Sequence, residues 1–159
     1  LGSVAQQIFQ CVPCPVLTVG PLAPGAGPHL QLHRVLFSTD LSPQSLAAVP
    51  FVLTAVREWH TELDILHVCT SQDPAHRAAM DQLRSDLDRC LDDTHLQGSI
   101  IAGKPADRVL EFTASHHEDL IVLGLKPHRA LYNGRLWSYA YEIVRRAPCP
   151  VLSVRTAPN

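Results

Sequence analysis

The stretch from Asp119 to Arg155 constrains the fold of this chain more than any other. It contains an apolar segment (DLIVLG), a basic loop (KPHRALYNGR), an amphipathic segment (LWSYAYEIVRRA) and a second apolar segment (PCPVLSV). The first apolar segment does not alternate with polar residues, which is typical of a strand buried on both faces of a parallel sheet. The order predicts strand, loop, helix and strand. Gly124 falls at the end of the first strand, where the backbone can turn and approach a ligand.

The boundaries of this unit carry their own signals. Ser138 is expected to open the helix as its N-cap, and Pro148 and Pro150 end the helix and begin the last strand. A strand, a loop and a helix N-terminus in this order form the usual geometry for holding an anion.

Strands alternate with helices through the rest of the chain. Further strands are expected at 34–38, 62–69 and 98–102, and further helices from Ser42, over 73–95 and over 106–115, with a kink or break at Pro50. This alternation implies a parallel sheet with right-handed crossovers, in which ligands bind at the carboxyl ends of the strands. The residues expected there are Asp40, Val68, Gly103 and Gly124.

Composition excludes several classes of protein. The 159 residues carry a net charge of −2 and 46% hydrophobic residues, as a soluble globular domain does, without the basic excess of a nucleic-acid binder. No apolar run has the length of a membrane span and the sequence shows no signal-peptide pattern, so we expect no membrane partner. Five scattered cysteines do not suggest a disulfide framework, which favours a reducing, cytoplasmic compartment.

The chain also contains an internal repeat. Residues 3–19 (SVAQQIFQCVPCPVLTV) align without a gap with residues 138–154 (SYAYEIVRRAPCPVLSV), at an offset of 135. The first copy has no strands of its own before it, so we interpret it as the tail of an upstream domain. A segment rich in proline and glycine (GPLAPGAGPH) follows it and is expected to be a linker.

Four signatures in order resemble the universal stress protein family: VLFSTDLS, ILHV, GKPADRVLEFTASHHEDLIVLG and SYAYEIVRRAPCPVLSV. The resemblance implies an α/β fold with a five-stranded parallel sheet and helices on both faces, a three-layer α/β/α arrangement of the flavodoxin-like kind. It also implies that residues 32–159 are one complete domain, that 21–31 are a linker, and that 1–20 are the last helix and strand of a truncated upstream domain, as in the second half of a tandem protein.

Family members of this kind form dimers or tandem pseudo-dimers through the last strand. An edge strand as apolar as the last one needs a partner, and the strand of the first repeat is its chemical twin. We therefore expect the two to pair, within one chain or between chains, across a near-twofold axis. The residues involved are Val151, Leu152 and Val154 with Val16, Leu17 and Val19.

Many members of the family bind ATP through the pattern G-x2-G-x9-G-[ST]. Gly124 and Ser138 match its first and last positions, but Pro127 and Trp137 replace the two glycines between them. Proline has no N–H to offer a phosphate, and tryptophan places a ring where main chain must approach it. The adenosine side of the site, Asp40, Val68 and Gly103, is retained, and Gly2-Ser3 matches the end of the pattern in the truncated copy.

The resemblance and this degraded pattern together predict a stress-response module that works through dimerisation and an unidentified protein partner, without a cofactor. An ATP-binding regulatory domain is the alternative, and an enzyme of unrelated chemistry is a third. No catalytic residue and no metal site is expected. We interpret His67 as a satisfied strand histidine, and Trp137, Tyr139 and Tyr141 as filling the emptied nucleotide cleft or the dimer interface.

Overall fold

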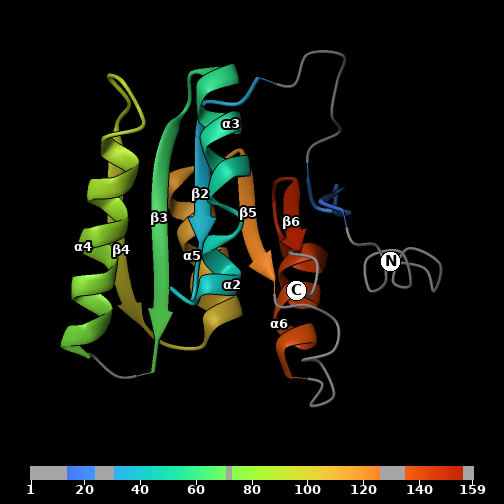
Figure 1. The fold of residues 1–159 in the computed structure, drawn as a ribbon. Helices are drawn as coiled ribbons and strands as arrows, with labels where there is room; N and C mark the ends of the chain where they lie inside the picture. Colours follow the sequence, from blue (N-terminus) through green and yellow to red (C-terminus); the bar gives the residue numbers. More distant parts are fainter. Residues whose placement is uncertain (1–13, 24–30, 71–72, 126–134, 156–159) are drawn as a thin grey trace.

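The computed structural model describes residues 14–23, 31–70, 73–125 and 135–155, and of residues 135–138 it describes only the backbone. These ranges form a six-stranded sheet with helices on both faces (Figure 1). The strands are β1 (Val16–Thr18), β2 (Arg34–Ser38), β3 (Glu62–Cys69), β4 (Leu96–Ala102), β5 (Leu120–Leu125) and β6 (Val151–Arg155). The helices are α2 (Pro43–Leu46), α3 (Val49–Trp59), α4 (Pro74–Asp88), α5 (Pro105–His116) and α6 (Arg135–Arg146).

The strand order is β1-β6-β5-β2-β3-β4, and every neighbouring pair is parallel except β1 with β6. This confirms the predicted three-layer fold with five parallel strands, to which β1 adds a sixth, antiparallel strand. The strand order reverses around β2, which lies between β5 and β3. In sheets of this kind the carboxyl ends of the strands at such a reversal form the ligand crevice.

The sheet is buried on both faces, as its uninterrupted apolar runs predict. Val35 and Phe37 of β2 belong to the hydrophobic core under α3 and α4, whereas Leu36 between them belongs to the core under α5 and α6. Strand β5 divides in the same way, with Val122 on the first side and Ile121 on the second. Figure 1 shows the two layers of helices on opposite sides of the strands.

Helix boundaries differ from the sequence prediction in two places. The helix expected over 73–95 starts at Pro74, with Asp73 as its N-cap, and ends at Asp88. The residues beyond it include Asp92, Asp93 and Thr94, which favour turns, and Asp93 adopts a left-handed φ of 50°. The helix from Ser42 is interrupted as expected. The break comes before Pro50, because proline is tolerated in the first turn of α3.

Strands β1 and β6 form a seam whose register follows the internal repeat. Leu17 lies opposite Leu152, Val16 opposite Ser153, and Thr18 opposite Val151. The repeat equates Val16 with Val151 and Thr18 with Ser153, so exchanging the two strands leaves the pattern of pairs unchanged. A near-twofold axis therefore passes between Leu17 and Leu152. In this structure the two strands pair within one chain.

Several predicted segments lie outside the described residues: the helix of the first repeat, linker residues 24–30, and the basic loop at 126–134. Among the residues that are described, no helix combines the length and the apolar character needed to cross a bilayer.

Candidate functional site

Four of the five residues expected at a nucleotide site lie along one edge of the sheet. Asp40 comes two residues after β2, Val68 is near the end of β3, Gly103 follows β4, and Gly124 is near the end of β5. These strands are adjacent and parallel in the order β5-β2-β3-β4, so their carboxyl ends meet at the same edge. The carboxyl ends of these strands thus bring together the four residues that the sequence analysis expects at this edge.

Asp40 holds the turn that leaves β2. Its Oδ1 accepts hydrogen bonds from the backbone N–H of Ser42 at 3.0 Å and from the Ser42 hydroxyl at 2.5 Å. The Ser42 Oγ in turn accepts a bond from the N–H of Ser45 at 3.3 Å, which caps α2. Asp40 is exposed, and its carboxylate orients the loop that leads to α2.

Two glycines at this edge are required by close contacts with the protein itself. A Cβ on Gly124 would lie 2.5 Å from the Cα of Ser45, because the backbone of α2 packs against β5 there. Gly103 adopts φ of 145°, a conformation that other residues rarely adopt, and a Cβ on it would lie 2.5 Å from Nε of Arg108. At Gly124 the close approach expected for a ligand is made by α2.

The prediction that Ser138 is the N-cap of α6 is wrong. Helix α6 begins at Arg135, so Ser138 lies inside the first turns of the helix and is not its N-cap. The physical reason is the absence of a breaker: Arg135 and Leu136 are good helix formers, and the helix continues back through them. The side chains of Ser138 and Trp137 lie outside the described residues, as does the whole of Pro127.

An aromatic side chain reaches the carboxyl end of β2 from α6. The hydroxyl oxygen of Tyr139 lies 2.9 Å from Oγ of Ser38, two residues before Asp40. Burial, with a smaller contribution from the Asp40 charge, raises the pKa of Tyr139 to about 12. Tyr139 thus lies beside the edge of the sheet where a nucleotide site is expected. Tyr141 lies elsewhere on α6, with the Arg145 guanidinium 6.0 Å from its ring centre.

A charged cluster that the sequence did not reveal lies at the amino ends of the strands, at the end of the sheet opposite to Asp40. Arg34 forms ion pairs with Glu62 at 2.5 Å and with Asp64 at 2.6 Å, and its Nε lies 3.7 Å from Oε1 of Glu118. Asp64 and Glu118 are buried, and burial followed by the Asp64 carboxylate raises the pKa of Glu118 to about 8. The available signal was the acidic residue inside the otherwise apolar run ELDILHVC.

A third group of polar side chains lies where β3 meets α4. His67, Cys69 and His76 each offer one ligand atom, and these atoms lie within 4.8 Å of one another. His67 is only 4% exposed, and its Nδ1 lies 3.0 Å from the carbonyl oxygen of Thr39. Its Nε2 is buried without a partner, so the interpretation of His67 as fully satisfied is wrong. The i, i+2 spacing of His67 and Cys69 on one strand was the signal for this group.

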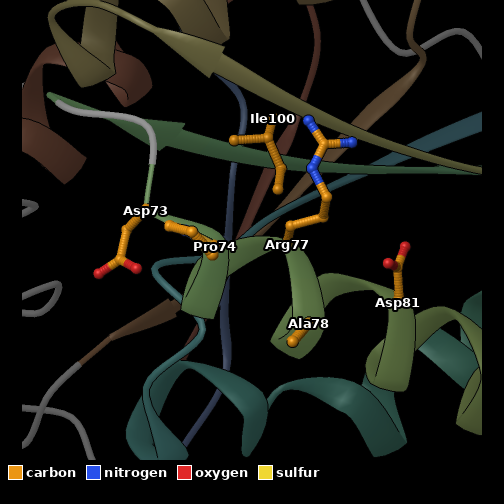
Figure 2. A pocket seen from close by; sticks show the side chains of 6 residues that line it. All are labelled: Asp73, Pro74, Arg77, Ala78, Asp81 and Ile100. Atoms are coloured by element: carbon orange, nitrogen blue, oxygen red, sulfur yellow. The ribbon is translucent and has the colours of Figure 1, made fainter.

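Two hollows adjoin these elements. The first, of about 540 Å³, runs along α4 beside β4. Figure 2 shows Arg77 beside Ile100 in this hollow, with Asp81 one turn further along the helix. The second, of about 220 Å³, lies between α3 and the β1–β6 seam and is almost wholly apolar. Its lining includes Leu17, Phe51, Trp59 and Leu152.

Similar proteins are found both among curated sequences and among solved structures. A curated Thermus aquaticus protein, a universal stress protein encoded in the 3′ region of a QAH/OAS sulfhydrylase gene, is 38% identical over 56 residues, which cover 35% of this chain and 41% of that protein. The crystal structure of a universal stress protein from Archaeoglobus fulgidus matches with a TM-score of 0.81 and 21% identity, over 99% of this chain and 56% of that one. A universal stress protein solved in complex with cAMP matches with a TM-score of 0.67 and 24% identity, over 80% of this chain and 99% of that one.

This chain spans 56% of the length of the Archaeoglobus protein, and the matched segment spans 41% of the Thermus protein. The family model described as "Universal stress protein family" matches residues 31–155, which contain all five parallel strands and the edge that carries Asp40, Val68 and Gly103. On this match the chain belongs to the universal stress protein family.

Proposed function

We propose that this chain is a stress-response module that acts through paired assembly and partner contacts, without a catalytic step and with a degraded nucleotide site. The observation that carries the proposal is the register of the β1–β6 seam, with Leu17 opposite Leu152. Two near-identical strands paired about a near-twofold axis are the arrangement expected where one domain of this fold meets another. The second domain is either an upstream half of the same protein or a second copy of this chain.

The apolar hollow beside the seam supports this proposal. Leu17, Phe51 and Trp59 line it and are 54%, 39% and 51% exposed. Large apolar side chains that gather at one exposed place typically mark an interaction surface. Because the near-twofold axis passes through the seam, a domain related by it places its own α3 on the same side of the sheet. The hollow is then covered from the other side of the axis.

The lack of a nucleotide is supported by three features of the expected site. Pro127 and Trp137 occupy two glycine positions of the phosphate-binding pattern. The backbone at Ser45 packs against Gly124, and Tyr139 bonds to Ser38 at the end of β2. A phosphate held by main-chain N–H groups needs open backbone, which neither proline nor a packed helix supplies.

Sedimentation of the 159-residue chain over a range of concentrations tests the assembly. We expect a dimer that the substitutions Phe51→Glu and Trp59→Glu convert to a monomer, because each places a charge in the apolar hollow. The matched control is Ala79→Glu on the exposed side of α4, which adds the same charge away from the hollow and leaves the dimer intact. A wild-type chain that stays monomeric throughout excludes a second copy of this chain as the paired domain.

An ATP-binding regulatory domain is the second candidate. Asp40, Val68 and Gly103 lie at one edge of adjacent strands, and a solved relative was crystallised in complex with cAMP. The adenosine side of a site can survive when the phosphate side does not. This candidate therefore predicts binding of adenine nucleotides that depends on Asp40.

Calorimetric titration with ATP, AMP and cAMP separates the two candidates. We expect no heat of binding at micromolar nucleotide. Micromolar affinity that is lost in the Asp40→Ala variant would establish the second candidate and overturn the proposal of a degraded site. The variant retains Ser42 as the cap of α2, so its folding can be verified by circular dichroism before the titration.

A further inference from the structure

We propose that His67, Cys69 and His76 form a binding site for one zinc ion, with a fourth coordination position left for water or another small ligand. The three residues are contributed by two elements, His67 and Cys69 by β3 and His76 by the first turn of α4. Their donor atoms lie within 4.8 Å of one another. The site is separate from the Arg34 cluster, which lies at the amino ends of the strands, and from the β1–β6 seam at the far edge of the sheet.

The hydrogen bond of His67 fixes which of its nitrogens is available. Nδ1 lies 3.0 Å from the carbonyl oxygen of Thr39, and a carbonyl can only accept. Nδ1 therefore carries the proton, and in the neutral ring Nε2 presents a bare lone pair. A metal-binding histidine is commonly oriented in this way, with its other nitrogen donating to a carbonyl or a carboxylate.

One ring nitrogen of each histidine lacks a hydrogen-bond partner. Nε2 of His67 and Nδ1 of His76 are buried atoms without a hydrogen-bond partner, and the two ring centres are 4.6 Å apart. His67 itself is 4% exposed. A buried polar atom without a hydrogen-bond partner is destabilising, and here two such atoms belong to neighbouring rings. A bound cation satisfies both at once.

The third donor determines the class of metal. The Cys69 thiol lies 3.7 Å from the carbonyl oxygen of Ile101, a weak contact that it can give up on losing its proton to bind a metal. Two imidazoles and a thiolate suit Zn²⁺, whereas Mg²⁺ and Ca²⁺ require oxygen ligands. Tetrahedral zinc with bonds of about 2.0–2.3 Å places its donors roughly 3.3–3.7 Å apart, so the three atoms need to close by at most about 1.5 Å.

The surrounding structure allows this closure. His67 and Cys69 are fixed on a central strand, and β4 pairs with both of them, at Ile100 and Ala102. His76 lies on a helix and is half-buried, so rotation of its side chain can bring Nδ1 toward the strand. Ile100, the cross-strand neighbour of His67, lines the 540 Å³ hollow along α4. The hollow therefore reaches the strand next to the one that carries His67 and Cys69.

The test uses the full 159-residue chain, stripped with a chelator and then titrated with Zn²⁺ against a chromophoric competitor and separately with Co²⁺. We expect one ion per chain, and for Co²⁺ the visible bands of a four-coordinate centre together with a thiolate-to-cobalt charge-transfer band. His76→Gln is expected to weaken Zn²⁺ binding by at least about tenfold. Cys69→Ser is expected to abolish the charge-transfer band.

Matched controls lie outside the group. Cys90→Ser removes an exposed free cysteine, and His95→Gln removes an exposed histidine bonded to Gln97, so both are expected to bind Zn²⁺ and Co²⁺ as the wild type does. Because His76 is only half-buried, its variant tests the site even if Cys69→Ser unfolds. The proposal is overturned if the wild type takes up no Zn²⁺ at micromolar concentration, or if His76→Gln binds it equally well.

Discussion

The backbone of Ser45 occupies the space that a side chain on Gly124 would need. A Cβ at that position would lie 2.5 Å from the Cα of Ser45. Helix α2 therefore packs directly on β5 at the edge of the sheet where nucleotide binding is expected. The glycine at the end of β5 has a structural role whether or not a ligand binds nearby.

Replacement of Gly124 by alanine should destabilise the fold, because backbone atoms cannot move aside as a flexible side chain can. Overpacking of this kind costs about 1–3 kcal/mol. Urea denaturation of Gly124→Ala measures the loss. The control is Gly98→Ala, where the added Cβ meets side-chain atoms of Arg84 and Met80 and no backbone, so the expected loss is smaller than that of Gly124→Ala. Equal stability of Gly124→Ala and wild type would show that α2 is not held against β5.

The buried Glu118 should make stability depend on pH. Its pKa is raised from an ordinary 4.5 to about 8, so between these values the folded chain keeps a proton that the unfolded chain has released. Folding then takes up a proton, and the free energy of unfolding falls as pH rises through this window, by at most about 1.4 kcal/mol per pH unit, and levels off above it.

The Glu118→Gln variant isolates this effect. It cannot ionise, so its free energy of unfolding should be flatter than that of the wild type between pH 5 and pH 8 in chemical denaturation. Glu111→Gln removes an exposed carboxylate paired with Arg108 and should leave the wild-type slope unchanged. Identical slopes for Glu118→Gln and the wild type would mean that Glu118 is ionised in the folded chain at neutral pH.

The hydrogen bond between Tyr139 and Ser38 ties α6 to the end of β2. Tyr139→Phe removes the hydroxyl and leaves the buried Ser38 without this partner, which should cost about 1 kcal/mol in thermal or chemical denaturation. Tyr141→Phe provides the control, since its ring keeps the contact with Arg145. A loss that is the same for both variants would argue against a specific role for the bond.

Removing the cation from the charged cluster should destabilise the fold more than the substitutions at Gly124 and Tyr139 do. Arg34→Met leaves Glu62, Asp64 and Glu118 without their shared partner, and breaking a buried ion pair on one side typically costs about 3–5 kcal/mol. Chemical denaturation at neutral pH measures the effect. Arg89→Met breaks only an exposed pair with Asp86 and should change stability by less than about 1 kcal/mol.

The apolar runs in the sequence predicted the layers of the fold well. Residues such as Ile121 and Val122 point to opposite sides of β5, so only a sheet covered on both faces can bury them. The turn at Asp40 and the cap at Ser42 also followed from local rules, because their hydrogen bonds join residues two or three apart.

Contacts between residues far apart in the sequence could not be predicted from such local rules. Tyr139 bonds to a residue 101 positions away, and Arg34 gathers carboxylates from two other segments. The prediction that Ser138 is the N-cap of α6 failed for a different reason. A serine favours the start of a helix, but nothing in the residues before it prevents the helix from beginning earlier.

The symmetric register of the seam has a consequence for strand exchange. Thr18 and Ser153 differ by a methyl group, and the other two positions of the paired segments are identical. Residues 151–153 of a neighbouring molecule would therefore offer β6 almost the same side chains as its own β1 does. If two molecules met at this edge, replacement of one strand by the other would cost little in side-chain pairing.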